Sequence, residues 1–160
     1  MAESDSSILA DVVGRALRTP ALVRAPLWVY RAGLGFLFGS RILMLEHVGR
    51  RTGLRRYVVL EVVEHPSPDT YVVPSGFGER SQWFRNVMAR PDVRISVGRR
   101  RGVAATARRR SASEADAALG RYIDRHHHAW AALKGVLEDT LGKRVEPPGT
   151  ELPLIELVVK

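Results

Sequence analysis

A basic turn between two apolar runs limits most strongly what this chain can fold into. The runs, Ile42 to Val48 and Tyr57 to Val63, are continuous and rich in β-branched residues, which is typical of strands. Gly49 and Gly53 stand between them, and glycine lets the backbone reverse tightly. The pattern predicts two strands joined by the turn, and therefore a fold that contains a sheet.

Further strands and several helices are predicted along the chain. Val93, Ile95 and Val97 alternate with polar residues, as in a half-buried strand. Other strands are expected over Thr70 to Val73, Val103 to Ala107 and Leu152 to Val159, with a reversal at His65 to Asp69. Helical spacing marks Ser4 to Arg18, Ala21 to Phe38, Glu79 to Ala89 and Ser113 to Leu141. Six short strands joined mostly by turns favour an α+β fold, a small antiparallel barrel decorated by helices.

The 160 residues are expected to form a single domain. We divide it into a helical segment over residues 1–39, a barrel core over 40–110, a C-terminal helix over 111–145 and a last strand over 151–160. The sequence contains no internal repeat and no sign of a second domain.

The turn of the predicted hairpin is rich in groups that bind anions. It carries Arg50, Arg51, Arg55 and Arg56, and Thr52 adds a hydroxyl. Planar guanidinium groups suit phosphate or carboxylate, and the glycines allow backbone N–H groups to converge. The alternative is a solvated turn in an arginine-rich protein.

A second stretch, Ser75 to Asn86, has the pattern of a glycine loop that leads into a helix. Exposed N–H groups at a helix start, reached through glycines such as Gly76, bind phosphate readily. Trp83 follows within two turns. It is either an anchor in the core or a surface against which a planar cofactor packs.

Charge and composition narrow the classes of partner. The net charge of +8 favours anionic ligands or membranes. No helix-turn-helix, zinc-finger or RNA-recognition signature is present, so we expect no nucleic-acid partner. The chain has no cysteine, which excludes disulfides and cysteine nucleophiles. Residues 21–38 are apolar but interrupted by arginines and glycines, and they form a helix packed on the domain or one that lies at a membrane surface.

Three consecutive histidines, His126 to His128, do not predict a metal site. Neighbouring side chains on a helix point about 100° apart, so three in a row cannot converge on one ion. His126 shares an apolar stripe with Tyr122 and Trp130, which makes it a candidate functional residue or a satisfied, half-buried histidine. Nothing marks a serine as a nucleophile. Anion sites without nucleophiles suit an enzyme whose cofactor performs the chemistry.

The motifs GRRTG, YVVPSGFG and WFRNVMARPDVRISVGRR, in this order over about residues 41 to 110, resemble a known family. They are similar to the deazaflavin-dependent nitroreductase-like oxidoreductases, a group with a split β-barrel. The resemblance implies coenzyme F420, whose tail carries a phosphate and a glutamate chain. It also implies that Arg50, Arg51, Thr52 and Arg56 approach that tail, that Ser75 and Gly76 line the phosphate or the ring edge, and that Trp83 and Asn86 support the pocket.

We therefore expect a cytoplasmic reductase that transfers a hydride from reduced F420 to a small electrophilic acceptor such as a quinone, nitroaromatic or activated alkene. The proton comes from water or from Tyr57, Tyr122 or His126. Two alternatives stay open: the same barrel could bind FMN, or the protein could be a non-catalytic cofactor carrier or a basic module that contacts the inner face of the membrane through residues 21–38. The oligomeric state is open, and a homodimer is one of the states that we consider.

Overall fold

A computed structural model of the chain describes residues 39–160. The predictions for the N-terminal helical segment and for membrane contact through residues 21–38 therefore lie outside the described residues. The structure contains seven strands: β1 (Ile42–Val48), β2 (Arg55–Glu61), β3 (Glu64–Ser67), β4 (Thr70–Pro74), β5 (Asp92–Val97), β6 (Arg100–Arg109) and β7 (Leu154–Val159). The helices are α3 (Gln82–Ala89), α4 (Ala112–Arg125) and α5 (His127–Leu141), with a 3-10 turn η2 (Gly78–Arg80) before α3.

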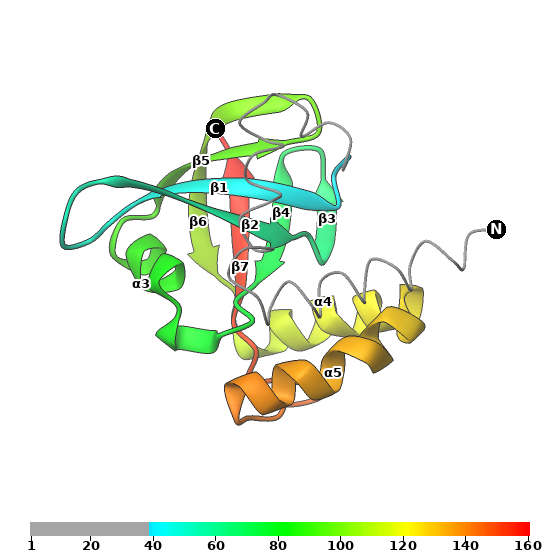
Figure 1. The fold of residues 1–160 in the computed structure, drawn as a ribbon. Helices are drawn as coiled ribbons and strands as arrows, with labels where there is room; N and C mark the ends of the chain where they lie inside the picture. Colours follow the sequence, from blue (N-terminus) through cyan, green and yellow to red (C-terminus); the bar gives the residue numbers. More distant parts are fainter. Residues whose placement is uncertain (1–38) are drawn as a thin grey trace.

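All seven strands form one antiparallel sheet in the order β2-β1-β5-β6-β7-β4-β3 (Figure 1). Strands β2 and β3 are its two edges, yet only Val62 and Val63 separate them in the chain. A connection this short reaches roughly 10 Å, so the two edges must lie close together. The sheet therefore curls into a barrel that remains open between β2 and β3, which confirms the expected α+β architecture with a split barrel.

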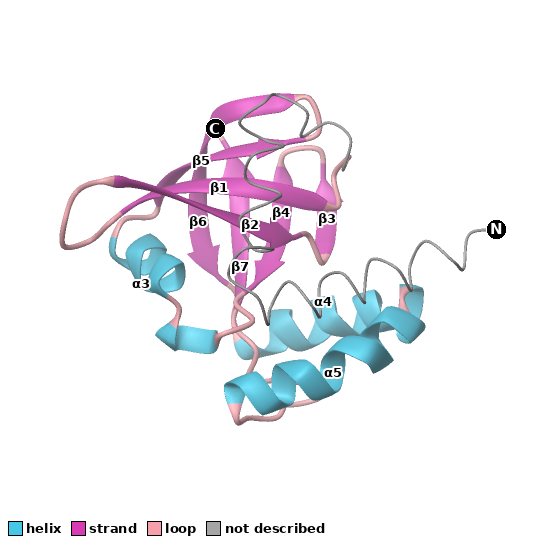
Figure 2. Cartoon of the chain, viewed as in Figure 1, coloured by secondary structure: helices cyan, strands magenta, loops and turns pink. Residues whose placement is uncertain are grey.

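Strands β4 and β7 carry buried side chains on both faces of the sheet. Val73 and Ile155 point into the barrel, where they join Leu43, Leu45 and Ile95 in the main core. Their neighbours Val72 and Leu154 point to the other face of the sheet, where they pack with Leu119, Tyr122 and Trp130 of α4 and α5. Figure 2 shows these two helices side by side below the sheet. The alternation of side chains along a strand thus supplies two cores from one sheet.

Helix α3 packs against the barrel beside β1 and β6. Its buried residues are Trp83, Phe84, Asn86 and Val87, and the three apolar ones belong to the barrel core. The sequence expectation that a helix runs from Glu79 is correct only from Gln82, because the preceding residues form the 3-10 turn η2.

Three local expectations were wrong. Residues Glu64–Ser67 form strand β3 rather than part of a reversal, because Pro66 is tolerated in an edge strand. The long C-terminal helix is interrupted at His126, whose backbone (φ −138°, ψ 45°) is not helical, so α4 and α5 are separate helices. Helix α4 is capped by Ser111 and Glu114 in a capping box, so it starts earlier than the expected helix start at Ser113.

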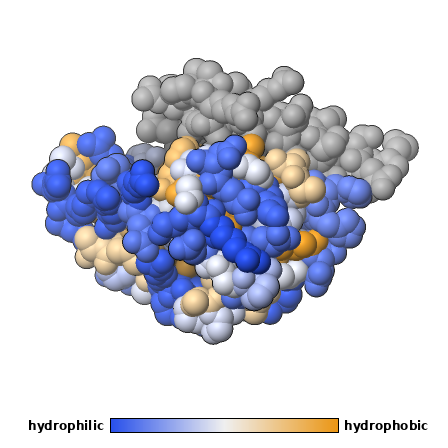
Figure 3. Space-filling model, turned by 90° about the horizontal axis from the view of Figure 1, so that it is seen from below, coloured by the Kyte–Doolittle hydropathy of each residue, from blue (hydrophilic) through white to orange (hydrophobic). Residues whose placement is uncertain are grey.

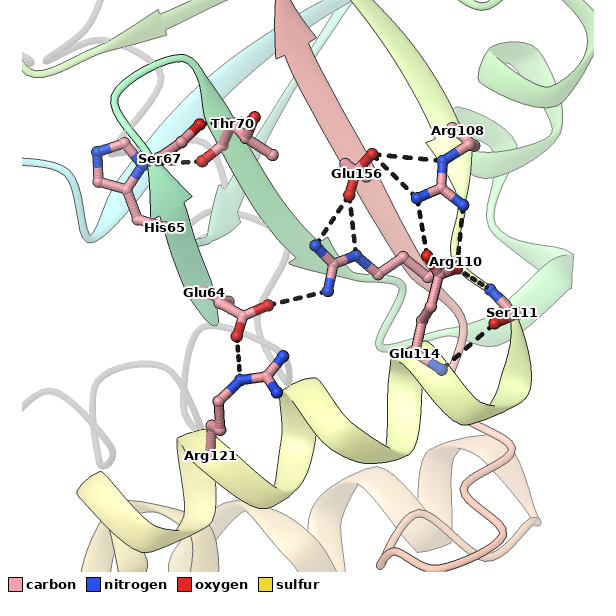
Figure 4. Close-up of polar contacts among 10 residues, drawn as sticks. All are labelled: Glu64, His65, Ser67, Thr70, Arg108, Arg110, Ser111, Glu114, Arg121 and Glu156. Atoms are coloured by element: carbon pink, nitrogen blue, oxygen red, sulfur yellow. Dashed lines mark hydrogen bonds and ion pairs between the residues drawn. The ribbon is translucent and has the colours of Figure 1, made fainter.

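A chain of ion pairs fastens α4 to the sheet (Figure 4). The Arg110 guanidinium contacts Glu64 of β3 at 2.9 Å and Glu156 of β7 at 2.8 Å. Glu64 also binds Arg121 of α4, and Glu156 also binds Arg108. Burial opposes ionisation of Glu64, but the two arginines outweigh it and hold the pKa of that carboxyl below its usual value.

Replacing Arg110 by alanine is expected to lower the free energy of unfolding by about 3 kcal/mol, because it removes the buried guanidinium that joins Glu64 to Glu156 and leaves each of these largely buried carboxylates with one half-exposed arginine. Arg110 and Glu64 are only 10% and 6% exposed, whereas Arg100 and Asp69 are 31% and 61% exposed. The control Arg100→Ala is therefore expected to cost less than about 1 kcal/mol. Urea unfolding of both variants checks the difference, and equal costs would contradict it.

Candidate functional site

The structure brings together the two stretches that the sequence singled out. Arg50, in the β1–β2 turn, reaches the first turns of α3. Its Nη1 donates to Gln82 Oε1 at 3.0 Å and to Asn86 Oδ1 at 2.9 Å, and its backbone N–H donates to Asn86 Oδ1 at 3.1 Å. The predicted anion turn is thus anchored to the start of the predicted anion-binding helix.

Asn86 is the centre of this contact and is buried. Its Nδ2 lies 3.2 Å from Nδ1 of His47, which is only 4% exposed. Burial, with Arg56 as the smaller cause, lowers the pKa of His47 to about 4. The imidazole is therefore neutral at physiological pH.

Three backbone N–H groups of the turn form hydrogen bonds within the turn itself. The N–H groups of Gly49 and Gly53 donate to Leu54 O and Gly49 O, both at 2.8 Å, and Leu54 N–H donates to Thr52 Oγ1 at 3.3 Å. Gly53 has φ 69°, and a Cβ on Gly49 would lie 2.6 Å from Thr52 Oγ1, so both positions require glycine. The glycines shape the turn, and side chains supply most of its donors for an anion.

Arg51 and Arg56 are exposed, and within the described part of the chain neither guanidinium has a hydrogen-bond or ion-pair partner. Arg100, Arg108, Arg109, Arg110 and Arg121, in contrast, are all ion-paired. Figure 3 shows hydrophilic residues gathered at its left end, where the β1–β2 turn projects in Figure 1. Strand β2 begins at Arg55 and not at Tyr57, so the unpaired Arg51 lies on the turn and the unpaired Arg56 on the adjoining start of β2.

The Ser75–Gly78 turn is held by its own hydrogen bonds and by contacts with the segment before β7 and with α5. Ser75 is fully buried, its Oγ donates to Gly78 O at 2.7 Å, and its N–H donates to Pro153 O at 2.9 Å. Gly78 has φ 66°, and a Cβ there would lie 2.7 Å from Leu141 Cδ2 of α5, while Gly76 faces Leu137. Phe77, between the two glycines, is 51% exposed.

Trp83 lies in the barrel core, 8% exposed, with its ring edge-on to Phe84 at a centroid distance of 6.3 Å. Of the two sequence interpretations, the core anchor is the one that its environment supports. From there Trp83 holds α3, and with it Asn86, against the barrel.

The three candidate proton donors fall in two places. Tyr57 lies on β2 opposite Glu46 of β1. The Tyr122 hydroxyl donates to Glu61 Oε1 at 3.1 Å, and the exposed His126 ring lies 5.1 Å from the Tyr122 ring. Tyr57 and Glu61 share one face of β2 but stand about 13 Å apart along it. The structure brings Tyr122 and His126 together and leaves Tyr57 nearer the arginine turn.

Glu61 and Tyr122 form a buried acidic pair. Burial raises the pKa of Glu61 and outweighs the hydrogen bond from Tyr122 and the charge of Arg41, both of which lower it. Burial also raises the pKa of Tyr122 well above its usual value, and Glu61 adds to the effect. The pair therefore retains its phenolic proton at neutral pH.

Sequence reasoning missed His47, Gln82 and Glu61. His47 had a signal, because it continues the inward alternation of Leu43 and Leu45 along β1. The partners of Gln82 and Glu61 lie 32 and 61 residues away, at distances that no local pattern reports. Among the described residues, no group of His, Asp and Glu side chains is arranged to hold a metal ion.

The available groups fit an anionic, extended ligand. Arg51 and Arg56 offer unpaired guanidiniums, and the hydroxyl proton of Thr52 has no acceptor within residues 39–160. Arg50 holds the turn in place. Phosphate and carboxylate groups are the anions that such a donor set can bind.

The fold is shared with solved structures at low sequence identity. A structure titled as an F420-H2 dependent reductase, FDR-A, is 20% identical and has a TM-score of 0.51, over 73% of this chain and 93% of that one. A domain-swapped dimer is 19% identical with a TM-score of 0.53, over 81% of this chain and 96% of that one. An Agrobacterium tumefaciens protein of unknown function is 18% identical with a TM-score of 0.53, and the match covers 85% of this chain and 55% of that protein. No curated protein matches the sequence.

In the part of the chain that the structure describes, no helix is long and apolar enough to cross a membrane. A family model described as F420H(2)-dependent quinone reductase matches residues 9–138, most of the chain. This match shows that the chain belongs to the F420H(2)-dependent quinone reductase family and is an F420-dependent reductase.

Proposed function

We propose that this reductase binds the tail of F420 at the β1–β2 turn and reduces a quinone. The observation that carries the tail site is the pair Arg51 and Arg56, which are exposed and without partners in residues 39–160. Arg51 lies on the turn that Arg50 anchors to α3, and Arg56 lies at the start of β2 beside it. Thr52 adds a hydroxyl to the same turn. Arg50 is itself committed to Gln82 and Asn86, so its main role is to hold the turn and its secondary role is to contribute charge.

The remaining predicted site residues form or support the surface on which the cofactor would lie. Ser75 and Gly76 belong to a turn that packs on α5, and through them the ring edge or the phosphate meets a preformed surface. Trp83 and Asn86 support it from α3. Pre-formed positions lower the entropy lost when a ligand binds, so this support contributes to affinity.

The acceptor class follows from the family description, which names a quinone. When bound, reduced F420 supplies a hydride from C5 of its deazaflavin ring. A quinone that takes up a hydride and a proton becomes a hydroquinone, so the chain must orient the acceptor and allow a proton to reach its oxygen. Two of the large exposed hydrophobic residues, Leu54 and Phe77, lie on the two turns of the site and offer apolar contact to such a ring.

Tyr122 is our first candidate for the proton donor. Its hydroxyl is held by Glu61 at 3.1 Å, whereas His126 is exposed at the junction of α4 and α5. Tyr57, on the same side of β2 as Glu61, is the second candidate. A hydroxyl in a fixed position can serve as a general acid. Glu61 can replace the proton that Tyr122 loses when the Glu61 carboxyl is itself protonated, a form that burial favours by raising its pKa.

FMN binding and a non-catalytic role both have less support than an F420-dependent reductase. The family description names F420 rather than FMN, and a reductase rather than a carrier. The absence of cysteine agrees with a reducing, cytoplasmic compartment.

The domain-swapped dimer among the similar structures supports a homodimer. Light scattering on the purified protein is then expected to give about twice the chain mass of 17.8 kDa, and the mass of one chain would contradict the dimer.

The double variant Arg51→Ala, Arg56→Ala is expected to weaken F420 binding about 100-fold. Each charge-assisted bond to a phosphate or carboxylate contributes about 1.5 kcal/mol, and each 1.4 kcal/mol is a factor of ten in Kd. Quenching of the cofactor's fluorescence measures Kd. The control Arg99→Ala, Arg125→Ala removes the same charge from two other exposed positions and is expected to change Kd less than about 3-fold. If both doubles weaken binding equally, the site assignment fails.

The variant Tyr122→Phe is expected to lower kcat for quinone reduction by about 100-fold and to leave the Kd for F420 unchanged, because a general acid typically contributes at least that factor. The control His126→Ala is expected to retain most of kcat. Steady-state kinetics at saturating cofactor make the comparison. Wild-type turnover in the Tyr122 variant, with loss in Tyr57→Phe, would transfer the role to Tyr57.

A further inference from the structure

The hydrogen bonds around Asn86 have only one consistent direction. Arg50 presents two donors, its backbone N–H and its Nη1, to the same amide atom of Asn86, and neither group can accept a hydrogen bond. That amide atom must be the oxygen. The amide nitrogen Nδ2, which can only donate hydrogen bonds, therefore lies 3.2 Å from His47 Nδ1.

The His47 ring is fixed by the same argument. Because Nδ2 of Asn86 donates, Nδ1 of His47 must accept, so the ring is neutral and carries its proton on Nε2. A proton on Nδ1 would place two donors against each other. The Asn86 amide could then turn its oxygen toward His47 only by presenting its nitrogen to the two donors of Arg50.

We infer that His47 is a positioning residue for the cofactor site: its unprotonated Nδ1 holds the Asn86 amide in the orientation that anchors Arg50, and through Arg50 the turn that carries Arg51 and Thr52. This inference rests on the proposed tail site. His47 itself does not contact the ligand, because it faces the barrel core along β1 with Leu43 and Leu45.

The surroundings make His47 hard to replace. It is 4% exposed and Asn86 is 5% exposed, so water has little access to the amide if the imidazole is lost. A buried donor without a partner is unfavourable, and the strain is relieved when Asn86 moves away. Across the β1–β2 pair, His47 also lies opposite Arg56, so a shift of the ring is transmitted to that arginine as well.

Two substitutions separate the hydrogen bond from simple packing. His47→Leu keeps an apolar side chain in the core but removes the acceptor. His47→Asn places an amide oxygen near the position of Nδ1 and keeps the acceptor. We expect the Kd for F420 to rise about 10-fold in His47→Leu and to stay within about 2-fold of the wild type in His47→Asn. The kcat at saturating F420 is expected to be unchanged in both variants.

A measurement without cofactor tests whether His47 holds Asn86, and through it Arg50, in place. The Arg50 backbone N–H donates to Asn86 Oδ1, so we expect its hydrogen exchange to be slow in the wild type. Exchange is expected to accelerate at least about 10-fold in His47→Leu and to remain slow in His47→Asn. Unchanged exchange at Arg50 in His47→Leu would overturn the inference. An unchanged Kd in the Arg51, Arg56 double variant would overturn the tail site instead and would leave the exchange result standing.

A third variant keeps the test decisive if His47→Leu does not fold. Asn86→Asp can still accept from Arg50 but cannot donate to His47. The carboxylate is then expected to draw a proton onto Nδ1, and ¹⁵N shifts of the His47 ring are expected to change from the neutral Nε2–H form to a ring protonated at Nδ1. A ring that stays in the Nε2–H form in Asn86→Asp would show that Asn86 does not set its state, and the inference would fail.

Discussion

The short connection between the two edges of the sheet is the constraint on which the rest of the structure depends. Only Val62 and Val63 lead from β2 to β3, so the sheet must curl until its edges lie close together. Curling gathers the inward side chains of β1, β4, β5, β6 and β7 into one core and leaves the outer face of β4 and β7 for α4 and α5. The candidate site is built from segments that lie outside the strands of the barrel: the β1–β2 turn, the start of α3 and the Ser75–Gly78 turn.

Closure also needs the last strand of the chain. Strand β7 pairs with both β6 and β4, so without it no strand pairing would join β3 and β4 to the rest of the sheet. Leu154, Ile155 and Leu157 are buried there, and Glu156 binds Arg108 and Arg110. Pro153, just before β7, accepts the Ser75 N–H, so the turn beside the site is complete only when β7 is in place.

Two sets of arginines have different physical roles. Arg108, Arg110 and Arg121 are paired with carboxylates and hold α4 to the sheet (Figure 4). Arg51 and Arg56 have no such partner within residues 39–160 and stand in solvent. A cation that already has a carboxylate gains little from a phosphate, whereas an unpaired one gains a charge-assisted bond. The net charge of +8 therefore says less about ligand binding than the location of the unpaired charges.

Local patterns were sufficient where the physical cause is local. The glycines of the β1–β2 turn, the alternation along β5 and the apolar stripe of α4 were readable, and they predicted strands, turns and an antiparallel barrel. The prediction failed where a local rule has an exception that depends on position in the sheet. Pro66 is tolerated because β3 is an edge, and the sequence does not say which strand is the edge.

The sequence by itself determined the two motifs, predicted an anionic ligand for them and, through the resemblance, indicated the cofactor class, because these depend on residue types at short spacing. Only the tertiary structure decided which arginines remain available, that Arg50 serves as an anchor, and that His47 and Asn86 direct it. Those roles depend on burial and on partners 36 and 39 residues apart, and hydrogen bonds across such distances form only once the sheet has curled and α3 has packed against it.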